Sequence, residues 1–468
     1  MSDSSSSSAV NVAAVILAAG KSTRMKSKTP KALHPLLGKP LLRFAAEAAQ
    51  AAGAQRTIIV IGHQSEAVKA SMGDDFEYVL QAEQKGTGHA VQMAEPLLSD
   101  WTGPVLVLPG DAPLVSGYLL QQLVEHHVNK GAAATLLTAV LDDAGAYGRI
   151  IRDPISNQVR AIVEAKDATP DQLKIGEIGT SVYAFDGRKL FETLRQIKPN
   201  NNQGEYYLTD VIALLANGAE VVEAVISPDP DVVRGINTRV ELTELSHLLR
   251  DRIHRAHQLS GVTIVDPLST FIDASVKIGQ DTVVYPFTVL SGVTDIGEDC
   301  EIGPGARISD AKIGNGVSVR DSYVVASEVG DNTRIGPYAN LRPGNVVGKG
   351  VKIGDFVELK QSTVGDKTSV GHFAYLGDAE VGARVNIGAG AITCNYAGPG
   401  RPKAKTVIGD DVFVGTNNTI VAPVTIHDNA YTAAGSTITE DVPAGALALG
   451  RARQVNKEGW VEKKKPVK

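Results

Sequence analysis

The sequence has little cysteine and few aromatic residues. Cys300 and Cys394 are its only cysteines in 468 residues. Two cysteines cannot build a disulfide framework, so the chain is expected to fold in a reducing cytoplasm. Aromatic residues make up 5% of the chain, whereas 47 residues are glycine. This balance suits short repeated strands with tight corners.

Long apolar runs and a strong net charge are also missing. No run of about eighteen apolar residues occurs, so no membrane-spanning helix is expected. The net charge of -6 is mild and does not indicate a nucleic-acid partner. Residues 1–9, MSDSSSSSA, lack the basic start of a secretory signal and are expected to be disordered.

The second half contains a repeated motif, an Ile or Val followed by Gly, often six residues after the last one. Fourteen such pairs occur, at Ile278-Gly279, Ile296-Gly297, Ile302-Gly303, Ile313-Gly314, Val329-Gly330, Ile335-Gly336, Val347-Gly348, Ile353-Gly354, Val364-Gly365, Val370-Gly371, Val381-Gly382, Ile387-Gly388, Ile408-Gly409 and Val414-Gly415. The first pairs of successive coils lie about seventeen or eighteen residues apart, so each coil contains three hexads.

This period predicts a solenoid in which each coil covers its neighbour. One aliphatic side chain per hexad is expected to point inward, and the glycine is expected to allow the bend at a corner. The alternative is a glycine-rich β protein with chance Val-Gly pairs, which fourteen pairs at this spacing argue against.

The first half instead alternates apolar strands with helices, which predicts an α/β domain with a mostly parallel sheet. The expected strands and helices are Val12–Ala18, Pro40–Ala52 (helix), Thr57–Ile61, Val105–Leu108, Leu119–Lys130 (helix) and Ala134–Leu141. Ligands of such sheets bind beyond the carboxyl ends of the strands.

Between the halves, Arg239–Ser260 has apolar residues at helical spacing among charged ones, which predicts a linking helix. We therefore expect an α/β domain over 1–238, a linker over 239–261 and a repeat domain over 262–468.

The turn after the first strand, LAAGKSTRM, has the composition of a phosphate-binding loop. Arg24 and Lys31 would add fixed positive charge for a triphosphate. The spacing is not that of a P-loop, and a basic surface turn is the alternative.

Two further segments support a nucleotide site. Gln81, Gly86 and Thr87 form a glycine-rich turn whose amide and hydroxyl groups suit a base edge. Asp111 follows a strand directly, where its carboxylate could bind Mg²⁺. A helix cap or turn is the alternative role for Asp111 taken alone.

The repeat half also has a candidate site. His372 and His427 are its only histidines, which is too few for a zinc site of the carbonic anhydrase type. His372 lies two residues after Val370 and near Tyr375. A polar, glycine-rich excursion over 395–405 interrupts the hexads, and such loops often carry function.

The ordered motifs LAAGKSTRM, PKAL, QAEQKGTGHA, GDAPL, YGRI, IVEAKDA and EYYLTD carry a family resemblance. They resemble the pyrophosphorylase half of the bifunctional N-acetylglucosamine-1-phosphate uridylyltransferase/glucosamine-1-phosphate acetyltransferase family. The repeat half resembles the other half of that family, so the resemblance covers nearly the full chain. It implies a Rossmann-like nucleotidyltransferase domain, a linking helix and a left-handed parallel β-helix of hexapeptide repeats.

For the first half the resemblance implies a uridylyl site with UTP and Mg²⁺ as ligands. The implied residues are Leu17, Ala18, Ala19, Gly20 and Lys31 for the nucleotide, with Gln81, Gly86 and Thr87 on the uracil, Pro109, Gly110 and Asp111 at the strand end, Gly148 and Glu164 on the sugar, and Asp111 and Asn237 on the metal. Arg24 and Lys31 are the candidate catalytic cations of this site. The family usually has Asn where Gly179 stands, and some relatives have Tyr in place of Pro109.

For the second half the resemblance implies that His372 is the general base of acetyl transfer. Arg342, Lys360, Tyr375 and Asn386 would then bind the sugar phosphate. Ala389, Asn395, Tyr396, Lys403, Thr416, Ala434 and Arg451 would contact acetyl-CoA. Thr416 replaces a Ser of some relatives and keeps the hydroxyl.

The resemblance therefore predicts a cytoplasmic homotrimer that acts on small molecules and makes UDP-N-acetylglucosamine by two reactions. Trimer sites of such β-helices usually lie between subunits, so Asn395 and Lys403 are candidates to act with a neighbour's His372. The alternatives are a single-activity sugar-1-phosphate nucleotidyltransferase whose β-helix is structural or regulatory, and a non-catalytic scaffold.

Overall fold

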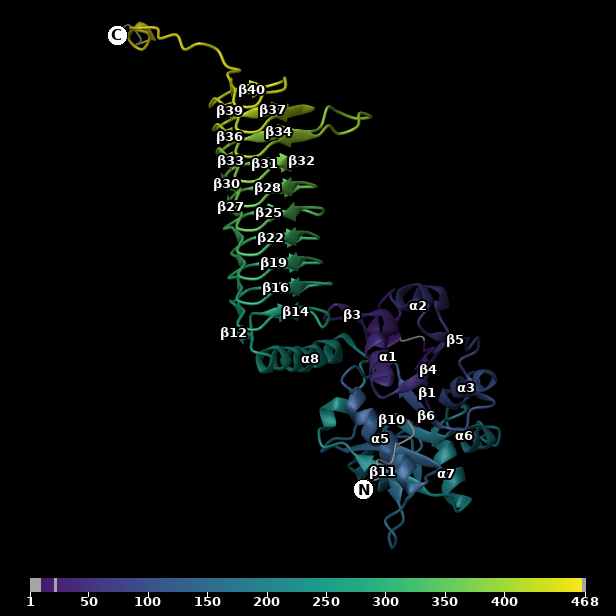
Figure 1. Ribbon diagram of the computed structural model, residues 1–468. Coiled ribbons are helices and arrows are strands. Elements are labelled where there is room, and N and C mark those ends of the chain that lie inside the picture. The colour runs from purple at the N-terminus through teal and green to yellow at the C-terminus, as the bar shows by residue number, and fades with distance from the viewer. Residues whose placement is uncertain (1–9, 21–22, 465–468) are drawn as a thin grey trace, which may run out of the picture. The chain divides into compact units, whose positions relative to one another are not determined.

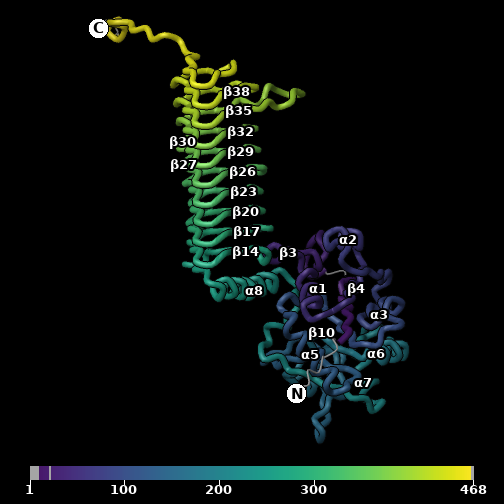
Figure 2. The backbone as a smooth tube through the Cα atoms, in the orientation of Figure 1, coloured from purple at the N-terminus to yellow at the C-terminus, as the bar shows by residue number. Residues whose placement is uncertain are grey.

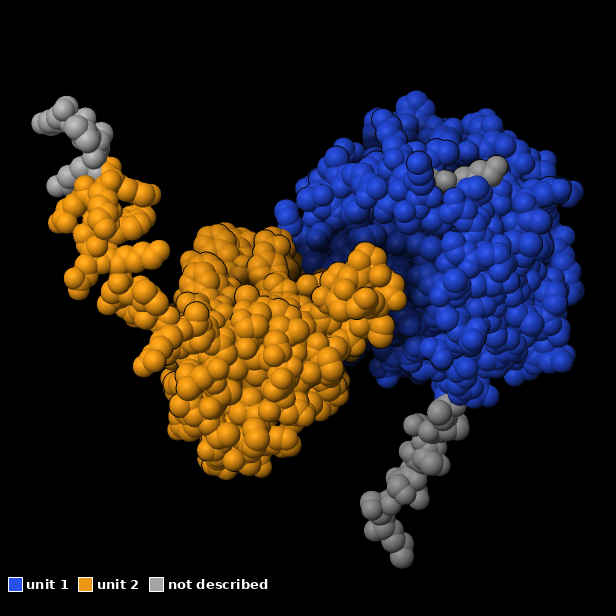
Figure 3. All heavy atoms as spheres, turned by 90° about the horizontal axis from the view of Figure 1, so that it is seen from above, with its two compact units in different colours: residues 1–249 blue, residues 250–468 orange. Residues whose placement is uncertain are grey.

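The computed structural model describes residues 10–20 and 23–464. Disorder was expected over residues 1–9, which lie outside this described part. The chain forms two compact units, residues 1–249 and 250–468 (Figure 3). The division falls within α8 (Arg239–Leu259), the helix expected over 239–260.

The first unit is built on a nine-stranded sheet. Its main path, in spatial order, is β11 (Val222–Ile226), β7 (Ala134–Val140), β10 (Glu177–Asp186), β6 (Pro104–Pro109), β1 (Val12–Ala18), β4 (Ala54–Ile61) and β5 (Glu77–Leu80). Only β10 on this path runs antiparallel to its neighbours, so the sheet is mostly parallel as expected. The antiparallel pair β8 (Arg149–Arg152) and β9 (Val159–Val163) extends from β10.

Helices cover both faces of this sheet, because alternate residues of β1 point to opposite sides. Ala14 and Ile16 pack with α1 (Leu41–Ala51), α2 (Ser65–Met72) and α5 (Gly117–Lys130). Ala13 and Val15 pack with the opposite layer. That layer contains α3 (Thr87–Gln92), α4 (Glu95–Leu98), α6 (Gly187–Leu194) and α7 (Thr209–Asn217).

The second unit is a parallel β-helix with three sheets of eleven, ten and nine strands. The strands of these sheets have two to four residues each. Successive coils stack on one another (Figures 1 and 2). The eleven-stranded sheet runs from β12 (Thr263–Ile264) to β41 (Leu447–Ala448). The ten-stranded sheet runs from β13 (Phe271–Ile272) to β40 (Thr437–Ile438), and the nine-stranded sheet from β14 (Lys277–Ile278) to β38 (Val424–Ile426).

The aliphatic residues of the fourteen repeated pairs form the axis of this core. All are buried except Ile278, which is partly buried and packs against the same cluster. A continuous column of Ile and Val side chains therefore replaces a single globular core, as the repeat predicts.

The glycines have a different role from the one expected. Of the fourteen, only Gly303 and Gly336 have a positive φ angle, so most do not need glycine for the bend. Instead the coils approach too closely for a side chain. A Cβ on Gly365 would lie 2.5 Å from the backbone carbon of Gly382 in the next coil. Backbone proximity between coils, rather than corner geometry, requires glycine at such positions.

One loop interrupts the coils, between β34 (Ile392–Cys394) and β35 (Thr406–Ile408), and it projects from the stack (Figure 1). This is the excursion expected over 395–405. Its ends meet where the Ala404 N–H donates to the Asn395 carbonyl at 3.0 Å. Within the described residues, every helix is too short or too polar to cross a membrane.

The stacking predicts that adding one methyl group between coils is costly. We expect Gly365→Ala to lower the stability of the β-helix by about 1–3 kcal/mol, because the backbone of the next coil must move. Gly371→Ala is the matched control, since a Cβ there meets no atom within 4 Å. Denaturant unfolding of both variants measures the difference. Equal stabilities would contradict this account of the glycines.

Candidate functional sites

The first site begins where two parallel strands end side by side. In the register of β1 and β6, Leu17 lies opposite Pro109. The Gly110 N–H donates to the Leu17 carbonyl at 3.0 Å, and a Cβ on Gly110 would lie 2.9 Å from that oxygen. The two glycine-containing turns therefore leave the sheet together, at the edge where α/β sheets bind ligands.

A cavity of about 500 Å³ opens at this edge, which is within the usual range for small-molecule sites. Thirteen residues expected in the uridylyl site line it: Leu17, Ala18, Ala19, Gly20, Arg24, Lys31, Gln81, Gly86, Thr87, Pro109, Gly110, Asp111 and Asn237. Segments far apart in the sequence thus meet in one place.

The polar centre of the cavity is a cluster of two oxygens and two cations. The Lys31 ammonium donates to the Asp111 carboxylate and, at 3.1 Å, to Asn237 Oδ1. The Arg24 guanidinium also donates to Asn237 Oδ1, at 2.8 Å. A carboxylate and an amide oxygen therefore converge on one cationic position.

This pair of oxygens fits the preferences of Mg²⁺, which binds oxygen and usually takes one or two carboxylates together with substrate phosphates. Within the described residues, no group of three or more His, Cys, Asp or Glu side chains could hold a metal. Asp111 and Asn237 can thus supply only part of a coordination shell, and a bound triphosphate would have to supply more.

The expected base-binding turn is held by a distant segment. Gln81 is buried, and its Nε2 donates to the Gly86 carbonyl at 3.1 Å. Gly86 has a φ angle of 110°, and a Cβ there would lie 2.5 Å from the Tyr206 carbonyl. Thr87 Oγ1 accepts the Leu208 N–H at 3.0 Å. The motif EYYLTD, which contains Tyr206 and Leu208, therefore positions this turn.

Gly148 and Glu164 do not line the cavity but lie beside each other. A Cβ on Gly148 would lie 3.5 Å from Glu164 Oε2. Glu164 accepts a hydrogen bond from the Thr209 hydroxyl at 3.3 Å. Burial raises the pKa of the Glu164 carboxyl above its usual value, and the Thr209 hydrogen bond opposes this effect only in part.

The sequence analysis missed several residues that line the cavity, among them Tyr147, Thr180, Ser181 and Gln84. Ser181 has a φ angle of 62° within an irregular part of β10 that begins at Gly179. No sequence pattern indicates this backbone. Tyr147 is the first residue of YGRI and could have been included from that motif.

The second site lies on the β-helix, around His372 at the end of β30 (Ser369–His372). Its side chain is exposed, and Nδ1 contacts the Asp355 carboxylate in β27 (Lys352–Asp355). Asp355 was not singled out from the sequence. Its signal is the spacing of one coil, since Asp355 and His372 are register partners in adjacent strands.

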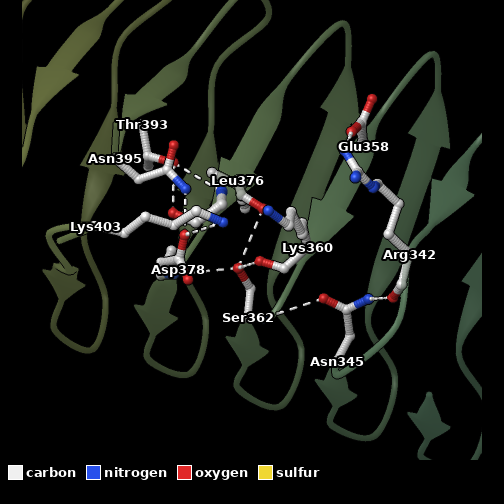
Figure 4. Close-up of polar contacts among 12 residues, drawn as sticks. Arg342, Asn345, Glu358, Lys360, Ser362, Leu376, Asp378, Thr393, Asn395 and Lys403 are labelled. Carbon is white, nitrogen blue, oxygen red and sulfur yellow. Dashed lines mark hydrogen bonds and ion pairs between the residues drawn. The ribbon is translucent and has the colours of Figure 1, made fainter. Parts of the chain in front are cut away.

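Cationic side chains gather on the neighbouring ten-stranded sheet (Figure 4). Arg342 follows β25 (Asn340–Leu341) and donates to Glu358 in β28 (Glu358–Lys360) at 3.0 Å. Lys360 belongs to the same strand. The nearby Lys403 ammonium lowers the pKa of Lys360, because two like charges disfavour the protonated form. These cations are suited to bind an anion.

Asp378 connects the excursion to this cationic group (Figure 4). The buried Asn395 side chain donates from Nδ2 to Asp378 Oδ2. Lys403 Nζ lies 3.9 Å from the same oxygen. Asp378, which the sequence analysis also missed, therefore holds both ends of the excursion. Tyr375 in β31 (Tyr375–Gly377) is the register partner of Glu358 in β28, one coil away.

The remaining residues expected at acetyl-CoA follow one corner of the β-helix. The Asn417 N–H donates to the Ala389 carbonyl, and the Gly435 N–H donates to the Thr416 carbonyl. Ala389, Thr416 and Ala434 thus occupy successive coils.

The other expected ligand contacts are more spread out, and Tyr396 lies at a different corner, between β34 and β35. Asn386 lies in β33 (Asn386–Ile387), opposite Ser369 of β30. Tyr396 is exposed at the start of the excursion. Arg451 Cδ lies 3.8 Å from the position of a Cβ on Gly435.

Comparison with known families assigns the two units separately. Residues 14–207 match the MobA-like NTP transferase domain. Residues 275–310 match the bacterial transferase hexapeptide family and residues 328–430 match the GMPPB C-terminal domain. The hexapeptide match and the three stacked parallel sheets confirm the expected fold class, an α/β nucleotidyltransferase domain followed by a left-handed β-helix.

Curated relatives match nearly the whole chain. Bifunctional protein GlmU of Geobacillus sp. (strain WCH70) is 49% identical over 450 residues, which cover 96% of this chain and 97% of the relative. Bifunctional protein GlmU of Caldanaerobacter subterraneus subsp. tengcongensis is 51% identical over the same shares. With this identity over both units, the chain belongs to the family of bifunctional GlmU proteins.

Proposed function

We propose that the chain catalyses two consecutive steps in the synthesis of UDP-N-acetylglucosamine. The β-helix transfers an acetyl group from acetyl-CoA to glucosamine-1-phosphate. The α/β unit then transfers uridylyl from UTP to N-acetylglucosamine-1-phosphate and releases pyrophosphate. Membership of the GlmU family supports both activities. The main structural support is that thirteen expected residues line one cavity.

In uridylyl transfer, a phosphate oxygen of the sugar attacks the α-phosphorus of UTP as the bond to pyrophosphate breaks. Such reactions depend on positioning and charge neutralisation rather than on a protein nucleophile. Arg24 and Lys31 bind phosphate oxygens at the mouth of the loop over 17–20. Without a ligand, the Lys31 ammonium neutralises the Asp111 carboxylate. When the triphosphate binds, Lys31 moves from Asp111 to the phosphate oxygens. Gln81, Gly86 and Thr87 bind the uracil.

Mg²⁺ is part of this proposal, with Asp111 and Asn237 as its protein ligands. The convergence of their oxygens on the Lys31 ammonium supports the assignment. The ion would supply positive charge against the triphosphate. Gly148 and Glu164 bind the sugar beside the cavity, which agrees with their positions next to each other.

In acetyl transfer, His372 accepts a proton from the amine of the sugar as the nitrogen attacks the thioester carbonyl. The carbon–sulfur bond breaks, and the coenzyme A thiolate takes up the proton held by His372 and leaves as the thiol. Arg342 and Lys360 bind the sugar phosphate, which relieves the repulsion between Lys360 and Lys403. Tyr375 and Asn386 bind the sugar. Hydrogen-bond donors around Ala389 and Asn395 stabilise the developing oxyanion.

Acetyl-CoA then lies along the corner formed by successive coils. Its proposed contacts are Ala389, Asn395, Tyr396, Lys403, Thr416, Ala434 and Arg451. The order of Ala389, Thr416 and Ala434 up this corner supports an extended ligand that starts near His372. Lys403 also lies next to Lys360, which is proposed to bind the sugar phosphate. Its ammonium is therefore suited to bind that phosphate as well.

We further propose that three chains assemble and that the acetyl sites lie between subunits. The match to the hexapeptide family supports an oligomer. In this arrangement Asn395 and Lys403 of one chain act with the partner's His372.

The uridylyl assignment predicts the effect of removing one cation. We expect Lys31→Ala to slow uridylyl transfer by about 10²- to 10³-fold, as for loss of one transition-state donor. Acetyl transfer should be unchanged. Lys39→Ala is the matched control, because Lys39 pairs with Glu47 and does not line the cavity. Release of pyrophosphate from UTP and N-acetylglucosamine-1-phosphate, with Mg²⁺, measures the rate. A wild-type rate in Lys31→Ala would overturn the assignment.

The acetyl assignment predicts that His372→Ala slows acetyl-CoA-dependent loss of the free amine by about 10²- to 10⁴-fold. Uridylyl transfer should not change. His427→Ala, at the other, exposed histidine of the β-helix, should retain full activity. An unaffected His372→Ala enzyme would favour a β-helix with a structural role only.

The shared-site proposal predicts complementation. Neither His372→Ala nor Asn395→Ala alone should acetylate efficiently, but mixed trimers should regain part of the rate. Subunits are unfolded together, refolded and assayed against each variant refolded alone. If mixing restores nothing, each site is made by a single chain.

A further inference from the structure

The coils that contain Asp355 and His372 differ from the rest of their sheet. In residues 263–448, all of which are described, the eleven-stranded sheet has nine strands of two residues. Only β27 and β30 have four. Both strands continue through the corner that ends the others, and this extension brings Asp355 opposite His372.

A glycine in the first of these strands makes this extension possible. A Cβ on Gly354 would lie 1.8 Å from the Gly371 carbonyl oxygen, the shortest such distance in the described chain. No side chain can occupy that position without separating the coils. The close approach of the backbone therefore fixes the spacing between the two residues that follow, Asp355 and His372.

The contact between these residues indicates which imidazole nitrogen carries a proton. His372 Nδ1 contacts Asp355 Oδ1, and because an ionised carboxylate can only accept, Nδ1 must carry the proton. The hydrogen bond from His372 lowers the pKa of the Asp355 carboxyl below its usual value, and the charge of Lys352 on the same strand adds to this effect. Asp355 therefore stays ionised near neutral pH.

The other side of the imidazole is accessible. The His372 side chain is 60% exposed. The next strand of the sheet, β33, ends at Ile387 opposite Val370, so it pairs no further along β30. A Cβ on Gly371 would meet nothing within 4 Å. The part of the imidazole that does not contact Asp355 is thus open to solvent at the corner where acetyl transfer is proposed.

We propose that Asp355 is a positioning residue for acetyl transfer. Its carboxylate orients the imidazole of His372 and keeps the proton on Nδ1, so that Nε2 can accept a proton from the substrate amine. Asp355 acts only through His372 and touches neither substrate. This inference rests on the proposed role of His372 as general base.

The test is the steady-state kinetics of acetyl transfer in the full-length protein, with glucosamine-1-phosphate and acetyl-CoA. We expect Asp355→Asn to lower kcat by about 10- to 100-fold, a part of the effect of a general base. KM for both substrates should stay within about twofold. The double variant Asp355→Asn/His372→Ala should be no slower than His372→Ala, because both changes remove one function.

Asp299→Asn is the matched control, since it makes the same charge change at an exposed corner residue in a distant coil. Uridylyl transfer and thermal unfolding report whether each variant is folded. If the Asp355→Asn variant is not folded, Asp355→Ala is measured in its place. An unchanged kcat, a raised KM alone, or losses that multiply in the double variant would overturn the inference. A wild-type enzyme that leaves the amine untouched would instead overturn the proposed function.

Discussion

Parallel hydrogen bonding between successive coils is the constraint on which the second unit depends. Each strand pairs with the strand one coil later, so residues separated by one turn of the repeat become neighbours. The buried Ile and Val column follows from this pairing, and so does the need for glycine where backbones nearly touch. The stack supplies both the stability of the unit and the distances within its site.

The same constraint arranges the proposed acetyl site in columns. Asp355 lies beneath His372, Glu358 lies beneath Tyr375, and Ala389, Thr416 and Ala434 follow one another along a corner. Such columns can match a long, thin ligand, since each coil adds one contact at a fixed interval. The α/β unit works differently: turns after two parallel strands, together with distant segments, surround a compact cavity.

Much of this architecture could be predicted from the sequence, because periodicity and strand–helix alternation reflect burial directly. The repeated Ile-Gly and Val-Gly pairs predicted a solenoid of stacked coils, and the apolar run at Val12–Ala18 predicted a strand that lies inside the sheet. The predicted role of the glycines, to allow a bend, was wrong in most cases. The sequence alone does not distinguish a bend from a close approach of two backbones.

The candidate sites were predicted less completely, for a similar reason. Residues in contiguous motifs were found, whereas Asp355 and Asp378 act through partners that only the stacking of coils reveals. Ser181 reaches the cavity because of an unusual backbone angle, which no residue type specifies. The domain boundaries and the roles of individual site residues remain predictions.

The narrow neck of the loop between Asn395 and Ala404 has a consequence for how such a protein can change. Because the loop leaves and re-enters the stack at one point, the strand after it resumes pairing in register, with Thr406 opposite Ala379. Insertions or deletions within the loop need not be transmitted to the coils on either side. The loop can therefore vary in length and composition while the paired coils beside it keep their arrangement.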